Sequence, residues 1–501
     1  MGVYFALAPI LVIALGGCGL MIAEAFSRYR PEVGEGPSSE LALPTAVVLL
    51  AAAVAAMGVW MVGPEHIEGV ASVAPWLLLD RFTLFFTVIM CLGGALAALL
   101  AGGYLPEHNL DRGEFYPLLI FSTLGCVMLA AAGDLLSLFI GLETMSLGVY
   151  AMTGFRRGSS RSAEAALKYF LLGSFAAALL LYGGALVYGA TGHTDLIGIG
   201  KVLTEGGAKL PLPMIVFAFG LILVGLLFKV SAVPFHMWAP DAYEGAPTPA
   251  MSFMAVAVKT AGFAMMLRVL LLAFGDAKFG SWSSGWPPVL AFLAILTMTV
   301  ANLIAGRQES VKRMLAYSSV AHAGYVLVGV VATLKVGAEA QASVMFYLLS
   351  YTVSTAGAVG ALILMGHRGA EAVSYEDIAG IGRRHPAAAL AMSFFLLSLA
   401  GVPPSAGFFA KLYVFRAALG GGFYLLTILG LLNSVLGAYY YLRVMVYMYM
   451  REPAPGAPFA TPMKSGMVTF ALVLSALLVA ALGIMPGSSL ALAIQAATRG
   501  G

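Results

Sequence analysis

Four ionisable side chains stand inside long uncharged stretches, where a charge is costly. They are Glu143 in LFIGLETMSLG, Lys229 in GLLFKVSAVP, Lys259 in AVAVKTAGF and Lys411 in GFFAKLYVF. A charged side chain at the centre of a bilayer costs about 2.5–3.5 kcal/mol on insertion scales, so each must face protein or water. Lysine can release its proton when it is desolvated, whereas arginine stays charged. The pattern predicts a proton path in which Glu143, if close to Lys229, holds that lysine in its charged form.

Three further basic residues in apolar segments have simpler explanations. Lys168 follows Glu164 by four residues near the start of a segment, so an ion pair along one helix explains it as well as a functional site does. Arg268 and Arg443 lie near segment ends, from which a long side chain can reach the membrane interface. We expect both arginines to extend to the interface.

His322, in YSSVAHAGYV, is a single histidine in an apolar segment. Imidazole titrates near neutral pH, which suits a relay between lysines. A histidine satisfied by polar neighbours in the core explains it equally well. Asp241 and Glu244 in DAYEGAPTP, and also Glu376 and Asp377, are expected to be solvated loop acids.

The sequence contains no pattern for a bound cofactor. Cys18, Cys91 and Cys126 lie in separate apolar segments without a C-x-x-C spacing, and no two histidines share a helical face at ligand spacing. No glycine-rich phosphate-binding motif follows a strand pattern. We expect no metal or cofactor on this chain, and the net charge of +3 without a basic run argues against nucleic acid.

The composition requires a membrane. Of 501 residues, 60% are hydrophobic and 10% are charged, which excludes a soluble enzyme. The apolar residues suffice for about fourteen spans of ~20 residues, so we expect an all-α polytopic protein with a single membrane domain, 1–501. The predicted spans are 4–25, 41–62, 82–102, 115–133, 135–154, 163–189, 213–240, 249–273, 287–306, 314–334, 341–365, 387–412, 422–447 and 466–487.

Two of these spans are predicted to be broken. The first contains Pro234 and Pro240, the second contains Pro403 and Pro404, and each break lies beside one of the lysines. Non-helical backbone at membrane depth survives only inside protein or against a water-filled cavity. Paired breaks are typical of inverted-repeat transporters, and kinks used only for packing are the alternative. The breaks lie about five spans apart, and this odd number gives the two units opposite topology.

The loops predict an orientation. About twice as many basic residues fall in loops on the side of the first loop, 27–40, as on the other side. We therefore expect that loop in the cytoplasm and both termini outside. The first segment lacks a basic region before it and is expected to be a retained helix.

The motifs around these residues resemble those of the antiporter-like membrane subunits of respiratory complex I, the bacterial NADH:quinone oxidoreductase, and are most similar in detail to its subunit N branch. The resemblance covers about residues 113–447, and a VPFHMWAPDAYEGAP block is highly specific for the superfamily. The lysine at Lys411 differs from the branch that carries glutamate on the corresponding helix.

This resemblance implies the fold and the roles of the residues. It implies two inverted five-helix repeats, 113–273 (helices 4–8) and 287–447 (helices 9–13), each with a broken helix. It implies that Glu143 pairs with Lys229 in a cytoplasmic half-channel, that Lys259 lies on the central axis, and that Lys411 serves the outward half-channel. His322 and Lys168 are further candidates on the proton path.

The resemblance also implies a partner assembly in the bacterial cell membrane. Neighbouring antiporter-like subunits and lipid would surround this chain, while NADH, FMN, iron–sulfur clusters and quinone would be bound by other subunits. Electron transfer there would drive proton pumping here, with no redox centre in this chain. Two rival hypotheses are a subunit of a multisubunit cation/proton antiporter and a structural arm subunit without its own proton path.

Overall fold

The computed structural model describes residues 2–26, 40–206, 210–366, 371–453 and 465–498. The regular secondary structure in these ranges is helical: α1 (Val3–Ala6), α2 (Ala8–Phe26), α3 (Ala42–Val62), α4 (Arg81–Glu107), α5 (Phe115–Ala131), α6 (Leu135–Thr153), α7 (Ser160–Thr191), α8 (Leu196–Glu205), α9 (Leu212–Lys229), α10 (Trp238–Gly245), α11 (Thr248–Phe253), α12 (Lys259–Arg268), α13 (Trp286–Ala305), α14 (Val311–Val336), α15 (Ala338–Met365), α16 (Ile381–Arg384), α17 (Pro386–Ala400), α18 (Ala406–Gly420), α19 (Tyr424–Met450), α20 (Gly466–Ile484) and α21 (Pro486–Thr498). The π-helical turn Met254–Val258 joins α11 to α12, and a second one, Val269–Ala273, extends α12, so that Thr248–Ala273 is one continuous helix.

These segments are helical because a bilayer offers no partner for exposed backbone N–H and C=O groups, and a helix satisfies them internally. Polar residues mark where many helices begin, because their side chains accept hydrogen bonds from the first free N–H groups. The capping residues include Asp80, Asp134, Ser159, Ser310, Ser405 and Ser465.

The described helices agree closely with the predicted spans. Twelve are long and apolar enough to cross a membrane, and two shorter apolar helices, Phe115–Ala131 and Pro386–Ala400, correspond to the other two predicted spans. The short helix α8 lies between the predicted spans 163–189 and 213–240, where we predicted no span. The first loop, 27–40, lies outside the described residues except for Glu40, so the structure does not test the orientation drawn from it.

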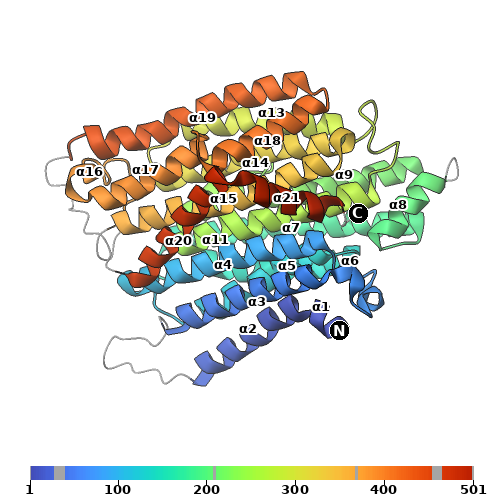
Figure 1. Ribbon diagram of the computed structural model, residues 1–501, viewed down its shortest axis with the longest axis horizontal. Coiled ribbons are helices and arrows are strands. Elements are labelled where there is room, and N and C mark those ends of the chain that lie inside the picture. The colour runs from blue at the N-terminus through green and yellow to red at the C-terminus, as the bar shows by residue number, and fades with distance from the viewer. Residues whose placement is uncertain (1, 27–39, 207–209, 367–370, 454–464, 499–501) are drawn as a thin grey trace.

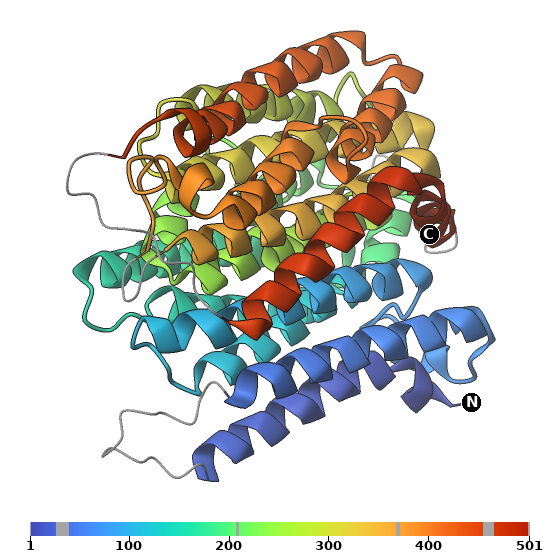
Figure 2. The same cartoon turned by 60° about the vertical axis from the view of Figure 1, so that its left-hand side comes forward.

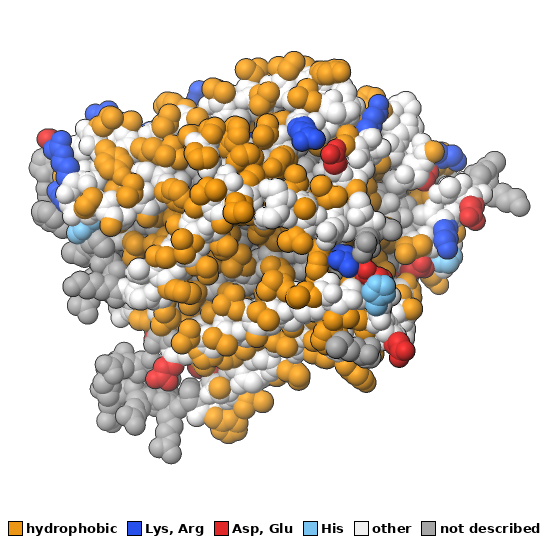
Figure 3. All heavy atoms as spheres, in the orientation of Figure 1, with side chains coloured by type: hydrophobic (Ala, Val, Ile, Leu, Met, Phe, Trp, Pro, Cys, Tyr) orange, Lys and Arg blue, Asp and Glu red, His pale blue; other side chains and the backbone are white. Residues whose placement is uncertain are grey.

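The long helices run roughly side by side (Figure 1). Both views place the N-terminal helices and α19 at opposite edges of the bundle, with the red α20 crossing it obliquely (Figures 1 and 2). The N and C labels lie at the same end of the bundle in Figure 1. Hydrophobic side chains cover most of the visible face, and charged side chains lie mainly toward its two ends (Figure 3). The helices buried most completely are α4, α11–α12, α14 and α15.

Both predicted helix breaks are present. Residues 230–237 separate α9 from α10 and contain Pro234, while residues 401–405 separate α17 from α18 and contain Pro403 and Pro404. Pro240 is a correction, because it lies in the first turn of α10. The N–H groups in the first turn of a helix have no partner within the helix, so a proline there costs no hydrogen bond and does not interrupt the helix.

Candidate functional site: a row of buried lysines

Lys229 is the last residue of α9 and is almost fully buried. Its Nζ donates a hydrogen bond to Oγ of Ser146 on α6 at 2.7 Å. The same ammonium lies 5.7 Å from the ring centroid of Tyr150, one helical turn further along α6. The end of α9 therefore holds a buried ammonium between a hydroxyl and the face of an aromatic ring.

Glu143 does not form the expected direct ion pair with Lys229. Within the described residues no ion pair involves Glu143, and its Oε1 is buried without a hydrogen-bond partner. Ser146 lies three residues further along α6 and takes the ammonium instead. Glu143 shares its helix with the exposed side chains of Ile140 and Leu147, three and four residues away. The side chain of Glu143 is therefore half-buried, with Oε1 turned away from solvent, and its charge acts on Lys229 without a direct contact.

Lys259 is almost fully buried and lies where the first π-helical turn ends and α12 begins. Its Nζ donates to the carbonyl oxygen of Ser319 on α14 at 2.6 Å and also to the hydroxyl of Ser319. Gly262, one turn beyond Lys259, packs on Lys229: a Cβ at Gly262 would lie 3.5 Å from the Cβ of Lys229. The backbones that carry the first two lysines are thus in direct contact.

His322 lies one turn beyond Ser319 on α14 and is buried. Its Nδ1 is 2.7 Å from the hydroxyl of Tyr347, and its Nε2 is 3.0 Å from the hydroxyl of Tyr441. The histidine therefore has a hydroxyl partner at each ring nitrogen. The structure satisfies it fully in the core, and the same contacts suit a relay, so both interpretations stay open.

Lys411 lies in α18, beyond the second break. Its Nζ donates to the carbonyl oxygen of Ala400, the last residue of α17, at 2.8 Å, and to Oγ of Ser434 on α19 at 2.9 Å. The ammonium also lies 5.2 Å from the ring centroid of Tyr325 on α14. Gly401 is left-handed with φ +89°, and a Cβ there would lie 3.1 Å from Cδ of Lys411, so only glycine fits. The break supplies the free carbonyl that binds this lysine.

Helix α14 contacts two of the three buried lysines, Lys259 and Lys411. Ser319, His322 and Tyr325 follow one another at intervals of three residues, and the first contacts Lys259 while the last contacts Lys411. Polar groups at this spacing lie on one face of a helix. Sequence reasoning identified His322 but missed Ser319 and Tyr325, although their three-residue spacing around His322 is visible in the span 314–334.

Comparisons with known proteins decide the family. A family model described as "NADH:quinone oxidoreductase/Mrp antiporter, TM" matches residues 132–437. NADH-quinone oxidoreductase subunit N 1 of Sorangium cellulosum (strain So ce56) is 69% identical over 501 residues, which cover 99% of this chain and 99% of that protein. The chain belongs to the subunit N family of NADH-quinone oxidoreductase. It is an antiporter-like, proton-translocating subunit of the membrane arm of complex I, and the resemblance seen in the sequence is confirmed.

Solved structures agree with this placement. A chain of respiratory complex I from Thermus thermophilus with bound aureothin is 34% identical, with a TM-score of 0.77, and the match covers 96% of this chain and 98% of that one. A chain of the Mrp complex from Dietzia sp. DQ12-45-1b has a TM-score of 0.81 at 22% identity, covering 98% and 97%. The second likeness shows the fold alone. The subunit N placement therefore rests on sequence identity rather than on the fold.

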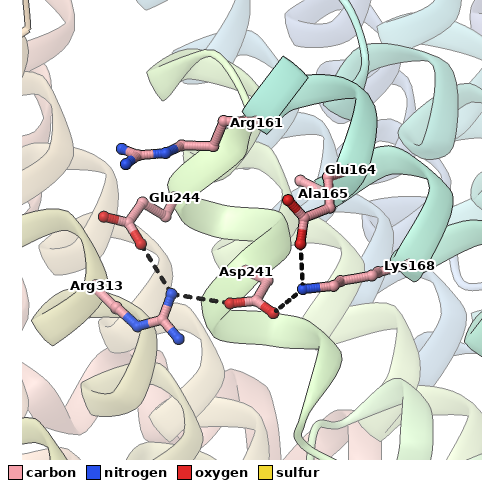
Figure 4. A pocket seen from close by; sticks show the side chains of 7 residues that line it. All are labelled: Arg161, Glu164, Ala165, Lys168, Asp241, Glu244 and Arg313. Carbon is pink, nitrogen blue, oxygen red and sulfur yellow. Dashed lines mark hydrogen bonds and ion pairs between the residues drawn. The ribbon is translucent and has the colours of Figure 1, made fainter. Parts of the chain in front are cut away.

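Lys168, another charged residue of this subunit N chain, pairs with residues other than Lys229, Lys259 and Lys411. Lys168 pairs with Glu164 at 2.6 Å, which confirms the predicted pair along one helix, and also with Asp241 at 3.1 Å (Figure 4). Asp241 and Glu244 were expected to be solvated loop acids, and this was wrong. Both lie on α10 and accept hydrogen bonds from Arg313 at 2.9 and 2.8 Å.

The two intramembrane arginines also hold fixed positions. The side chain of Arg268 is 2% exposed and pairs at 2.6 Å with Asp80, the residue before α4. Arg443 is half-buried and donates to the carbonyl oxygens of Gly306 and Gln308, both at 3.0 Å. Both arginines therefore reach groups at helix ends, namely the residue before α4 and the carbonyls after α13, and their extension to the membrane interface stays a prediction.

A second ionic cluster, which sequence reasoning missed, lies around Glu371. This carboxylate is buried, and it accepts hydrogen bonds from Thr248 at 2.6 Å, from Lys312 and from Tyr104, with Arg156 at 3.4 Å. Burial alone would raise the pKa of Glu371, but these partners lower it further than burial raises it, to about 2. The cluster ties the segment after α15 to α4, α11 and α14.

Glu371 therefore predicts a pH dependence of stability. A carboxyl group with a lowered pKa in the folded state stabilises the fold above its ordinary pKa of 4.5, and this contribution is lost as the pH falls toward 2. We expect Glu371→Gln to destabilise the subunit by about 3 kcal/mol at pH 7, with the difference from wild type vanishing near pH 2. Thermal unfolding of the purified complex between pH 7 and pH 3 measures this difference. A gap that stays constant over that range would contradict it.

Proposed function

We propose that Lys229, Lys259 and Lys411 carry protons in turn across this subunit. The observation that supports this most strongly is their shared environment. Each ammonium is buried and bound by uncharged oxygens, and none of the three forms an ion pair within the described residues. A lysine without a counterion in a low-dielectric site releases its proton readily when the local field changes.

The contacts suggest an order for the transfer. Lys229 and Lys259 are joined through Gly262, and Lys259 and Lys411 are joined through the polar face of α14. His322 lies between the two ends of that face and can pass a proton through the hydroxyls at its two nitrogens. We propose the sequence Lys229, Lys259, His322, Lys411, with Lys168 outside the path because it is half-exposed and held by two acids.

Two inverted repeats, 113–273 and 287–447, account for the paired breaks. Figure 1 places α9, the first half of the first broken helix, toward the right beside α8, and α17, the first half of the second, toward the left beside α16. The chain therefore enters the two broken helices from opposite ends of the bundle. This opposite direction is what inverted topology predicts.

The driving force in this proposal comes from elsewhere in the complex. Electron transfer from NADH to quinone on other subunits changes the electrostatic balance along the membrane arm, and Glu143 passes that change on because its charge acts on Lys229. Moving one charge against 100 mV costs about 2.3 kcal/mol, which a modest change of local field can supply.

We propose further that this chain binds no cofactor, lies beside other antiporter-like subunits in the cell membrane, and has both termini on the outer side.

Glu143 provides a direct test. Because its carboxylate does not contact Lys229 directly, Glu143→Gln should slow coupled NADH:quinone turnover by about fivefold or more, the lower end of a typical coupling free energy, without preventing assembly. The measurement is proton uptake and NADH oxidation in membrane vesicles that contain the variant complex. Glu114→Gln, at an exposed acid, is the matched control. Wild-type pumping in Glu143→Gln would exclude this role.

The same vesicles separate the rival functions. An antiporter subunit would exchange sodium for protons without NADH or quinone, whereas our proposal predicts transport only during electron transfer and no dependence on sodium. If the subunit were purely structural, its variants would either fail to assemble or pump as wild type. Slower pumping by a fully assembled variant supports the proposed proton path over both alternatives.

A further inference from the structure

The short helix α10 connects the first break to the rest of the molecule. A helix of eight residues is not stable alone, so its neighbours determine its position. Trp238, its first residue, stacks on Tyr169 of α7 with ring centroids 4.1 Å apart, and its Nε1 donates to the carbonyl oxygen of Phe228 at 3.1 Å. Phe228 directly precedes Lys229. The beginning of α10 is therefore bonded to the backbone beside this lysine.

An aromatic row continues from α10 to the ammonium group itself. Tyr169 meets Tyr150 edge to face at 4.8 Å, and the ring of Tyr150 faces Nζ of Lys229. The ring of Tyr150 has little room to move, because its hydroxyl packs directly against Gly173. A Cβ added at Gly173 would lie only 2.0 Å from this hydroxyl. A displacement of α10 would consequently change the surroundings of Lys229 from two directions.

The acidic face of α10 lies in a polar pocket of about 220 Å³ between α7 and α14. Figure 4 shows Asp241 between Lys168 and Arg313, with Glu244 on the other side of the guanidinium. Arg313 Nη1 donates to Asp241 at 2.9 Å and to Glu244 at 2.8 Å. One guanidinium from α14 thus binds both acids of α10.

Both acids are held in fixed positions by ion pairs. Hydrogen bonds between a carboxylate and a cation are stronger than those between neutral groups, and Asp241 makes two of them. The helix that provides Arg313 also provides Ser319, which binds Lys259. Arg313 and Ser319 lie on the same continuous helix, so a shift of α14 reaches both α10 and Lys259.

We propose that Arg313 is a positioning residue that ties the position of Lys229 to that of Lys259. It acts through Asp241 and Glu244, which hold α10, and through the aromatic row from Trp238 to Tyr150. This inference rests on the proposed proton path. Its consequence is that the two lysines change their surroundings together rather than one at a time.

The test removes the charge of Arg313 in the assembled complex. Arg313→Gln should lower coupled turnover by about threefold or more and also lower the number of protons pumped per electron pair, and Arg313→Lys should restore part of both losses by keeping one charge. Arg157→Gln is the matched control at another arginine outside the row, because its pair with Glu114 is long, at 3.8 Å, and both side chains are more than half exposed. If Arg313→Gln does not assemble, Glu244→Gln removes one of the two contacts and should give a smaller loss of the same kind.

A double variant separates positioning from a general structural effect. If Arg313 acts through α10, adding Trp238→Leu to Arg313→Gln should cause little further loss, whereas two independent structural defects would multiply. Multiplied losses, or wild-type pumping in Arg313→Gln, would overturn the inference. If Lys229→Ala pumps normally, the proton path itself is wrong; if Lys229→Ala fails and Arg313→Gln is normal, only the positioning role is wrong.

Discussion

Complex I that carries Lys229→Ala in this subunit is expected to lose coupled NADH:quinone turnover by at least about tenfold, because a positioned proton carrier contributes a factor of this size or more. The substitution removes the ammonium that bonds Ser146 and leaves the end of α9 without a group that can hold a proton. Proton uptake by sealed vesicles and NADH oxidation with a quinone acceptor measure the effect.

A second substitution at the same position separates charge from proton transfer. Lys229→Arg keeps the positive charge but cannot release a proton, so pumping should remain low although assembly is preserved. Lys278→Ala, at an exposed lysine in a loop, should behave as wild type. Substantial pumping by Lys229→Arg would show that only the charge matters at this site.

Lys411→Ala is expected to reduce pumping about as strongly, because it removes the last carrier on the proposed path. The carbonyl of Ala400 and the hydroxyl of Ser434 would lose their shared donor. Lys411→Glu should pump clearly faster than Lys411→Ala, since a carboxyl group can also bind and release a proton.

The control for this second prediction is Lys335→Ala. Lys335 lies in the last turn of α14, is exposed, and contacts only the ring of Phe423 among the interactions described for it. It should pump normally. Equal losses in Lys335→Ala and Lys411→Ala would indicate that any change at this end of the bundle disturbs the complex, and a specific role for Lys411 would then be unsupported.

Sequence alone located the lysines because charge is rare in apolar spans. A lysine among twenty apolar residues has no inexpensive explanation, so Lys229, Lys259 and Lys411 were conspicuous. The breaks were also predictable, since Pro234 and the pair Pro403 and Pro404 remove backbone donors in the middle of a span. Pro240 was misjudged because its effect depends on where a new helix starts, and this register is not visible in the sequence.

The partners of the lysines were not predictable in the same way. Serine costs little in a buried helix because its hydroxyl can bond the preceding turn, so Ser146 and Ser319 did not differ from other serines. Asp241 looked like a loop acid because Arg313, its partner, lies 72 positions away in the chain. Arg268 and Asp80 are 188 positions apart, and only the fold brings them together.

The number of protons pumped per electron pair in Lys229→Ala complex tests the central claim most directly. It should be measured in vesicles in which assembly and NADH oxidation with an artificial acceptor match wild type. Our account predicts a ratio clearly below that of wild type, with the Lys278→Ala control unchanged. A wild-type ratio in fully assembled Lys229→Ala complex would contradict the account, because protons would then cross without the first carrier of the row.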